Sequence, residues 1–376
     1  MTFSFALSIG GGTATSAALT EALQSIEVEE NVDGPSAMTI TMPVNRTPSG
    51  DLTYVDDGSF EPYTPVSVVL QAGPFATECV FDGYMLSWRL HLDRATAKSS
   101  IRAWAQDASC LMNLNDVVRE WPGLTDGEVA NEIFSAYGFA PAPANLDDDS
   151  PAHLPEQHTL LQRATDLRFL HTLARRGGKF CRVACAEKPG ARTGYFSRPS
   201  WQPAAATLDL SDPFAWSVDS LDVDWDVMRP TEVRASQASF AAPGPAVPAI
   251  ELSSGLPVLG SRDLRAYAVK PSVTLLTAAA DPQELRQRGA AVLAESGWFA
   301  TCTGETDLDR LGTVLRAGTV VNIDGAGQAH SGNWLVWRVN HWIEPDSCRV
   351  RFTLARNAIG PSGAAGAAGA LLGGLL

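Results

Sequence analysis

Two stretches of the chain match each other without a gap, and this match limits the fold more than any other feature. Residues 83–103 align with residues 332–352 at one constant offset. The coinciding positions are Gly83 with Gly332, Leu86 with Leu335, Trp88 with Trp337, Arg89 with Arg338 and Arg102 with Arg351. In both stretches apolar and polar residues alternate, as they do in the strands of a half-buried sheet. The repeat predicts two related small β-barrels in one chain.

The composition is that of a folded chain with several domains. Of the 376 residues, 45% are apolar and 19% are charged, which separates the chain from disordered sequences. A chain of this length suits roughly two to four domains. The net charge of −14 argues against nucleic-acid binding, because contact with phosphates needs a basic surface.

The cysteines and the apolar runs predict where the chain folds. The six cysteines are scattered and include no C-x-x-C pair, which predicts reduced thiols and a cytoplasmic location during assembly. The first residues lack the basic segment of a signal peptide, and no apolar run approaches the roughly 20 residues of a membrane span. We therefore expect no membrane insertion.

Strand and helix patterns predict an α+β protein that is mainly β. Thr125 and Glu128 have the spacing of a capping box, so a helix is expected to begin there. The predicted parts are a first β-barrel (1–112), an inserted α/β domain (113–207), a second β-barrel (208–238 and 300–360), an insertion with one helix (239–299) and a flexible Gly/Ala/Leu tail (361–376).

The segment from Gln157 to Val183 is predicted to join a helix to a strand. Leucines and alanines between Leu160 and Ala174 recur at helical spacing, so we expect one helix over this length. The Gly-Gly pair at 177–178 ends the helix, and a strand begins at Phe180. Such a unit docks one helix face onto a sheet and contains no reaction centre.

The pattern T-D-L-x-F-L-x-x-L-A-x-x-G-G at residues 165–178, followed by a strand, resembles the central segment of phage tail baseplate hub proteins. That family includes the phage late control D protein, the T4 gp27-like proteins and the hub part of the VgrG spikes of type VI secretion. The resemblance implies a gp27-like hub fold with two similar small barrels per chain and α/β segments inserted between and within them. A homotrimer would then form a ring of six barrels.

The same resemblance implies a structural role. Such a ring adapts a three-fold spike to a six-fold inner tube and nucleates tube assembly. Its place is a phage virion tail or a contractile injection particle, and its partners are the tube, the spike and other baseplate proteins. A VgrG chain continues into the spike, whereas this sequence ends in a short tail after Gly360. We therefore expect a separate spike protein.

A small set of residues is predicted to contact neighbouring chains. They are Trp88, Arg89, Asp222, Asp224, Asp226, Trp337, Arg338, Leu375 and Leu376. The Trp and Arg residues lie on predicted barrel strands, where core packing with a solvent-facing Arg is the alternative. The aspartates line the lumen of the ring or touch a neighbouring chain. The two terminal leucines dock on the spike or tube, or else belong to a flexible tail.

Asp222, Asp224 and Asp226 also allow a catalytic interpretation. Carboxylates two residues apart on a strand share one face at about 7 Å, within the range of an inverting hydrolase pair. Any half-buried strand shows the same polar stripe, so we expect no enzyme. The rival functions are a cell-wall peptidoglycan hydrolase and a glycan- or receptor-binding tail protein whose exposed tryptophans bind sugars.

The other chemically active residues match no known site. The six histidines have no metal-ligand spacing, and Cys181 and Cys185 lack a second pair of ligands. The glycine run at 10–12 lacks the Lys-Ser/Thr pair of a phosphate-binding loop. We therefore expect no metal and no cofactor.

Overall fold

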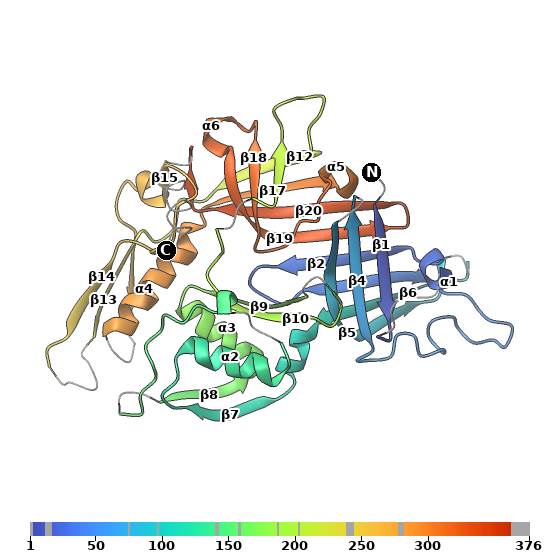
Figure 1. Cartoon of the computed structure of the whole chain (residues 1–376), viewed down its shortest axis with the longest axis horizontal. Coiled ribbons are helices and arrows are strands. Elements are labelled where there is room, and N and C mark those ends of the chain that lie inside the picture. Colours follow the sequence, from blue (N-terminus) through green and yellow to red (C-terminus); the bar gives the residue numbers. More distant parts are fainter. Residues whose placement is uncertain are drawn as a thin grey trace.

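Alternating apolar and polar residues build one large sheet of 12 strands (Figure 1). The computed structural model describes residues 3–11, 17–73, 76–95, 98–139, 143–156, 159–185, 188–201, 204–237, 244–276 and 282–361. The main path of the sheet follows the order β1 (Ser4–Ile9), β4 (Pro65–Ala72), β5 (Ala76–His91), β6 (Ser100–Asp107), β3 (Ala37–Pro43), β2 (Ser25–Asn31), β19 (Gly332–Glu344), β20 (Ser347–Arg356), β17 (Ala300–Asp307) and β12 (Ser220–Trp225). Off this path, β18 (Val320–Asp324) pairs with β19, and β11 (Ala206–Asp209) pairs with β18.

The large sheet consists of two units with the same strand order. In the first unit, the pairing order is β1-β4-β5-β6-β3-β2, and in the second unit it is β11-β18-β19-β20-β17-β12. Numbered within each unit along the chain, the two orders are identical. The two units differ in the direction of their first strand, because β1 is antiparallel to β4 whereas β11 is parallel to β18. The prediction of two related β units agrees with this repeated topology.

The two units do not form separate closed barrels. β2 of the first unit pairs with β19 of the second unit, so one hydrogen-bond ladder runs from unit to unit. Among the described residues, β1, β11 and β12 each have a single neighbouring strand, so the sheet is open at these three strands. The expected pair of small closed barrels is therefore not found, because the strand at the end of the first unit joins the second unit instead.

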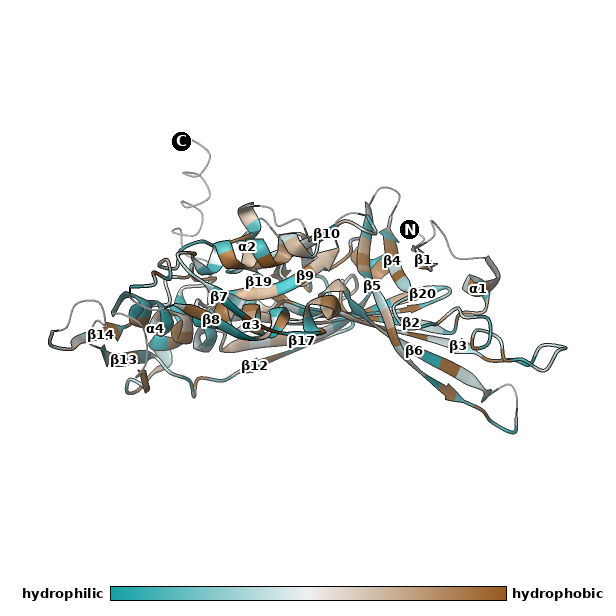
Figure 2. Ribbon diagram, turned by 90° about the horizontal axis from the view of Figure 1, so that it is seen from below, coloured by the Kyte–Doolittle hydropathy of each residue, from teal (hydrophilic) through white to brown (hydrophobic). Residues whose placement is uncertain are grey.

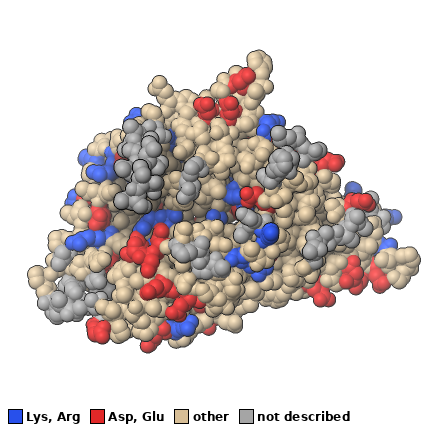
Figure 3. Space-filling model, in the orientation of Figure 1, with Lys and Arg blue, Asp and Glu red and all other residues tan. Residues whose placement is uncertain are grey.

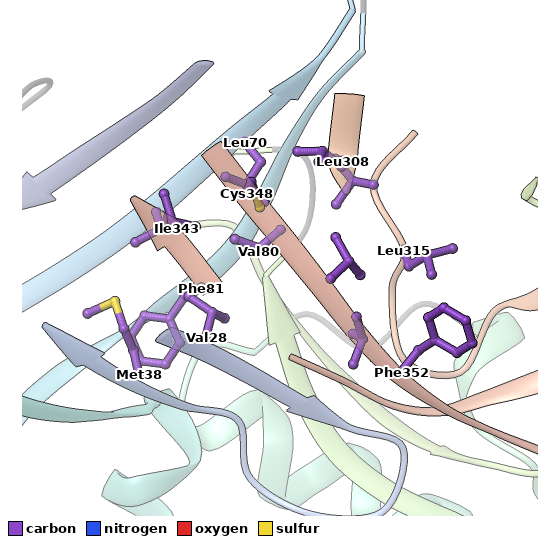
Figure 4. Close-up of a cluster of buried hydrophobic side chains, with 14 of the residues drawn as sticks. Val28, Met38, Leu70, Val80, Phe81, Leu308, Leu315, Ile343, Cys348 and Phe352 are labelled. Carbon is purple, nitrogen blue, oxygen red and sulfur yellow. The ribbon is translucent and has the colours of Figure 1, made fainter. Parts of the chain in front are cut away.

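One hydrophobic core lies between the two units. β1 and β4 run across the direction of β19 and β20 (Figure 1). Leu70 of β4 and Val80 of β5 lie beside Ile343 of β19 and Cys348 of β20 (Figure 4), and all four residues are at most 1% exposed. Strands far apart in sequence are thus packed into a single apolar cluster.

Hydrogen bonds and bulges define which residues of the two units are equivalent. A β-bulge follows Met85 in β5, and another follows Val336 in β19. The amide of Met85 donates to the Thr64 carbonyl at 2.9 Å, and the amide of Val336 donates to the Thr319 carbonyl at 2.8 Å. Met85 and Val336 are therefore equivalent.

This equivalence corrects the gapless matching of the two hairpins. Trp88 corresponds to Val339 rather than to Trp337, whereas Arg102 and Arg351 remain equivalent. The links between the hairpin strands differ in length: eight residues separate β5 from β6, but two separate β19 from β20. The two strands of a hairpin therefore cannot keep one common offset.

The first inserted segment forms a small α/β body beside the sheet (Figure 1). Its elements are η2 (Ala108–Asn113), β7 (Asp116–Trp121), α2 (Asp126–Ala136), η3 (Pro143–Asn145), β8 (Leu160–Thr165), α3 (Asp166–Arg176), β9 (Phe180–Cys185) and β10 (Arg192–Ser197). Thr125 Oγ1 accepts a hydrogen bond from the Glu128 amide at 3.1 Å, and the Glu128 carboxylate accepts one from the Thr125 amide at 2.9 Å. The predicted capping box is confirmed.

The helix expected from Leu160 onward begins six residues later. Residues 160–165 form β8, which pairs with β7 along its whole length, and α3 begins at Asp166. The longer helix is wrong because this ladder satisfies the backbone groups that a helix would use. The helix ends before Gly177, and a strand follows from Phe180, as predicted.

The second inserted segment is a three-stranded sheet with one long helix. Its elements are β13 (Glu232–Gln237), β14 (Val247–Glu251), β15 (Arg262–Asp263), η4 (Leu264–Tyr267), β16 (Val273–Leu276) and α4 (Pro282–Gly297). The remaining short elements are α1 (Ala17–Glu21), α5 (Leu308–Leu311), α6 (Gly327–His330) and β21 (Ala358–Ile359). Helix α4 packs against β13 and β14.

Candidate assembly interface

The pairing of β2 with β19 joins the two units inside the chain. Six residue pairs run antiparallel between residues 26–31 and 338–343. Glu29 forms an ion pair with Arg338 at 3.3 Å, and Asn340 Nδ2 donates to Glu27 Oε1 at 2.8 Å. Acidic side chains of β2 thus meet basic or amide side chains of β19 on the outer face of the sheet.

The same outer face contains an open hollow in the second unit. The hollow has a volume of about 310 Å³ and is lined by residues of four strands, including Asp222 of β12 and Arg338 of β19. Arg351 and Glu305, which also line it, form an ion pair at 3.0 Å. The structure therefore brings together two of the predicted contact residues, Asp222 and Arg338.

β12 is an edge strand, and β17 is its only neighbour among the described residues. The Asp226 amide donates to the Phe299 carbonyl at 2.8 Å. Because alternate residues of an antiparallel strand face the neighbouring strand, the backbones of Leu221, Val223 and Trp225 point away from β17. No other described strand pairs with this edge, so its N–H and C=O groups are a template for a further strand.

The three aspartates do not form one continuous stripe. Asp222 and Asp224 are exposed residues of β12, but the strand ends at Trp225. Asp226 belongs to the turn that follows. Its carboxylate accepts hydrogen bonds from the Met228 amide at 3.0 Å and from Arg229 Nε at 3.1 Å, and these contacts lower the pKa of Asp226.

The ends of β5 and β6 extend beyond the rest of the sheet (Figure 2). Trp88 is 44% exposed and Leu92 is 51% exposed. Arg89 lies directly opposite Arg102; Arg102 is 3.7 Å from Glu27, whereas Arg89 has no ion pair within the described part of the chain. Like charges directly opposite each other destabilise a hairpin, so this end suits an acidic partner.

Trp337 lies inside an aromatic cluster rather than on the exposed sheet face. Its ring packs edge-on against Phe180 at 5.2 Å and against Trp298 at 5.8 Å, and Trp298 stacks on Trp201 at 5.9 Å. The cluster joins the sheet to both inserted segments, so Trp337 packs within its own chain. Leu375 and Leu376 lie outside the described residues.

Sequence reasoning missed a second internal match. The sequence SIEVEEN of β2 and the sequence SLDVDWD at residues 220–226 share an initial Ser, a central Val and acidic residues at the third and fifth positions. The match is short and conservative, and it becomes recognisable once the strand order shows that β2 and β12 are counterparts. Both strands carry carboxylates on their outer face.

Within the described ranges, no group of three or more His, Cys, Asp or Glu residues is placed to hold a metal ion. In the same part of the chain, no helix has both the length and the hydropathy needed to cross a membrane.

No protein-family model matches the sequence, and no curated protein matches it. Solved structures do match its fold. The 43 kDa tail protein of prophage MuSo2 from Shewanella oneidensis superposes with a TM-score of 0.64 at 12% identity, covering 95% of this chain and 99% of that chain. A tail protein from Neisseria meningitidis MC58 gives a TM-score of 0.64 at 12% identity, with 95% and 97% covered.

Secretion proteins match as well. The E. coli c3393 protein, a type VI secretion component with structural similarity to the T4 tail proteins gp27 and gp5, gives a TM-score of 0.55 at 13% identity, covering 93% of this chain and 76% of that chain. A chain of the Francisella PdpA–VgrG complex gives 0.56 at 10% identity, with 96% and 59% covered. The fold is therefore similar to that of these phage tail and type VI secretion proteins, and the predicted resemblance in fold is confirmed.

Proposed function

We propose that the chain is a non-enzymatic baseplate hub of a contractile tail or related injection system. Three copies form a ring that holds a separate three-fold spike and seats the six-fold inner tube, whose assembly the ring nucleates. The repeated strand order of the two units is the main support for this proposal. Two like units in each of three chains supply six similar positions, which reconciles a three-fold spike with a six-fold tube.

The ring assembles in the cytoplasm and becomes part of a phage virion tail or an injection particle. The fold of the matching tail proteins supports this location. Because one fold can host several functions, the decisive test is the assembly itself. Light scattering of the purified chain, alone and with the tube and spike proteins of its own system, is expected to give a trimer that binds both. A chain that stays monomeric with both partners would contradict the proposal.

The exposed position of the aspartates supports a structural rather than a hydrolytic role. Asp222 lines an open hollow, and Asp224 stands on the same exposed strand edge. The purified protein is therefore expected to leave peptidoglycan intact. Release of soluble fragments by the wild type, with loss of this release in Asp224→Ala, would show instead that the chain is a hydrolase.

A further inference from the structure

The strand pairing that joins the two units is used once within each chain. It connects β2 of the first unit to β19 of the second unit. By the repeated strand order, the counterpart of β2 is β12 and the counterpart of β19 is β5. β12 has a free edge, and residues 86–91 of β5 pair only with β6 among the described strands. Each chain therefore has both halves of a second junction, and both are unpaired.

The hydrogen-bond ladders assign equivalent residues in these strands. Met85 corresponds to Val336, so Arg89 of β5 corresponds to Asn340 of β19. Following the ladders through β3 and β6, and through β17 and β20, places residues 25–31 of β2 over residues 220–226. Under this assignment Glu29 corresponds to Asp224. The similarity of SIEVEEN to SLDVDWD supports the same register independently.

We propose that β12 of one copy pairs antiparallel with residues 86–92 of the next copy, in the register that β2 adopts on β19. The partner is a second copy of this chain, and the proposal rests on the ring proposed above. Transferring the observed register gives the pairs between copies. They are Trp88 with Trp225, Arg89 with Asp224, Leu90 with Val223, His91 with Asp222, and Leu92 with Leu221.

The charges at this junction are complementary. Arg89, which forms no ion pair with the described residues of its own chain, comes opposite Asp224. In the existing junction, the equivalent residues on the outer face are Asn340 and Glu29. Asn340 donates a hydrogen bond to Glu27, and Glu29 forms an ion pair with Arg338. An acidic strand laid on a basic strand is therefore already the arrangement that joins the units.

The apolar residues and the backbone agree with the same pairing. Trp88 is 44% exposed, Leu92 is 51% exposed and Trp225 is 41% exposed, and the junction covers all three. In the existing junction the Val32 amide donates to the Trp337 carbonyl at 3.0 Å, so the even-numbered residues of β2 face β19. Their counterparts on β12 are the residues whose backbones point outward, which is the condition for adding a strand.

The junction is head-to-tail, so repetition makes a ring. Each copy offers β12 at one end and β5 at the other, and a heterologous contact of this kind forms a closed ring or an open filament. In a ring of three copies, junctions within chains and junctions between chains alternate. All six would use the same pairing, so neither β12 nor the far end of β5 would keep an exposed edge.

A charge exchange tests the register. Arg89→Asp and Asp224→Arg are each expected to weaken trimer formation at least ten-fold in light scattering, because each places like charges opposite one another. The double variant restores the pair and is expected to recover the trimer. Arg349→Asp, on the outer face of β20 and away from the junction, is the matched control. Far-ultraviolet circular dichroism checks that each variant folds.

A cysteine pair tests the same contact by cross-linking and introduces no like charges. Arg89→Cys combined with Asp224→Cys is expected to give, after mild oxidation, covalent dimers and trimers on a denaturing gel. Ser87→Cys combined with Asp224→Cys shifts the pairing by two residues and is expected to give few, since a disulfide needs closely spaced Cβ atoms.

The outcomes separate this inference from the proposed function. A wild-type trimer that is unaffected by either single charge reversal, or that forms no cross-link through residues 89 and 224, would overturn the junction and leave the hub proposal standing. A wild-type chain that remains monomeric with its spike and tube proteins would overturn both.

Discussion

His341 makes the folded chain sensitive to acid. The residue is fully buried in β19, and neither ring nitrogen has a hydrogen-bond partner among the described residues. Burial, with a smaller contribution from Arg316, lowers the pKa of His341 from 6.5 to about 3. The unfolded chain therefore takes up a proton at a higher pH than the folded chain does. The free energy of unfolding falls as the pH drops below 6.5, and this loss ends near pH 3.

The expected loss is about 1.4 kcal/mol for each pH unit in that window, or roughly 2 kcal/mol between pH 7 and pH 5. Urea unfolding of the wild type and of His341→Leu at these two pH values measures it. The leucine variant is expected to show a smaller difference between the two pH values, because it has no proton to take up. Equal pH dependence in both proteins would mean that His341 does not control acid stability.

Arg356 is a buried cation that lies over the Trp334 ring and donates its hydrogen bonds, among the described residues, to backbone carbonyls. The side chain has no exposed area, and it donates to the carbonyls of Leu259 at 3.2 Å, Ser331 at 3.1 Å and Gly360 at 2.8 Å. Burial lowers the pKa of Arg356 to about 10, so the group remains charged at neutral pH. It fastens the end of β20 to loops from two other parts of the chain.

Removing these donors is expected to be costly. Arg356→Met leaves several buried carbonyls unpaired and is predicted to lower the free energy of unfolding by about 3 kcal/mol. Chemical denaturation measures the loss. Arg349→Met changes an Arg that is 65% exposed by side chain, and it is expected to change stability by about 0.5 kcal/mol or less. Similar losses in both variants would contradict a special role for Arg356.

At the scale of elements, Gly304 allows β12 to lie against β17. A Cβ at this position would be 2.5 Å from Phe352 Cζ and 2.8 Å from the Ser220 carbonyl oxygen. Gly304→Ala is therefore expected to cost about 1–3 kcal/mol through overpacking and to loosen β12. Hydrogen exchange should rise in residues 220–225 and stay unchanged in β4. An unaltered β12 would show that the sheet absorbs the methyl group by shifting Phe352 alone.

Elements set by local chemistry were predictable from the sequence. The capping box at Thr125 and the helix end at Gly177 depend on residues within one turn, and the structure confirms both. Residues 160–165 have helical spacing too, yet they form a strand because β7 lies beside them. A spacing pattern carries no information about a partner some 40 residues away, and tertiary pairing decides in such cases.

The candidate interface could be predicted only in part, for a similar reason. The sequence suggests Arg89 and Asp224 as candidate contact residues, since each is a charged residue on a strand with an apolar opposite face. Their placement opposite each other in the proposed junction depends on the strand equivalence that the bulges after Met85 and Val336 define. The link between β19 and β20 is shorter than the link between β5 and β6, and the alternating pattern of the strands shows no trace of this difference. The gapless alignment is therefore displaced by two residues in the first strand of the hairpin.

At the scale of the whole molecule, the shared core predicts that the two units unfold together. Leu70 of β4 and Cys348 of β20 belong to one buried cluster, although they lie far apart in sequence (Figure 4). Separating the units would expose the apolar faces of both and leave the β2–β19 ladder unpaired, at a cost of about 25 cal/mol for each Å² of apolar surface. We therefore expect neither unit to be stable without the other.

Hydrogen exchange in increasing urea tests this cooperativity. Peptides from β4 and from β20 are expected to lose protection at the same urea concentration, and Leu70→Ala should lower that concentration for both strands, since a buried Leu→Ala change costs about 2–5 kcal/mol. The inserted α/β body has its own cluster around Phe134 and Leu170, so its peptides serve as an internal comparison. Loss of protection in β4 well before β20 would mean that the units are independent domains and that the core between them contributes little. The proposed junction between copies repeats the one within the chain. In the assembled ring, β5 and β12 are therefore expected to lose protection together, and at a higher urea concentration than in the isolated chain.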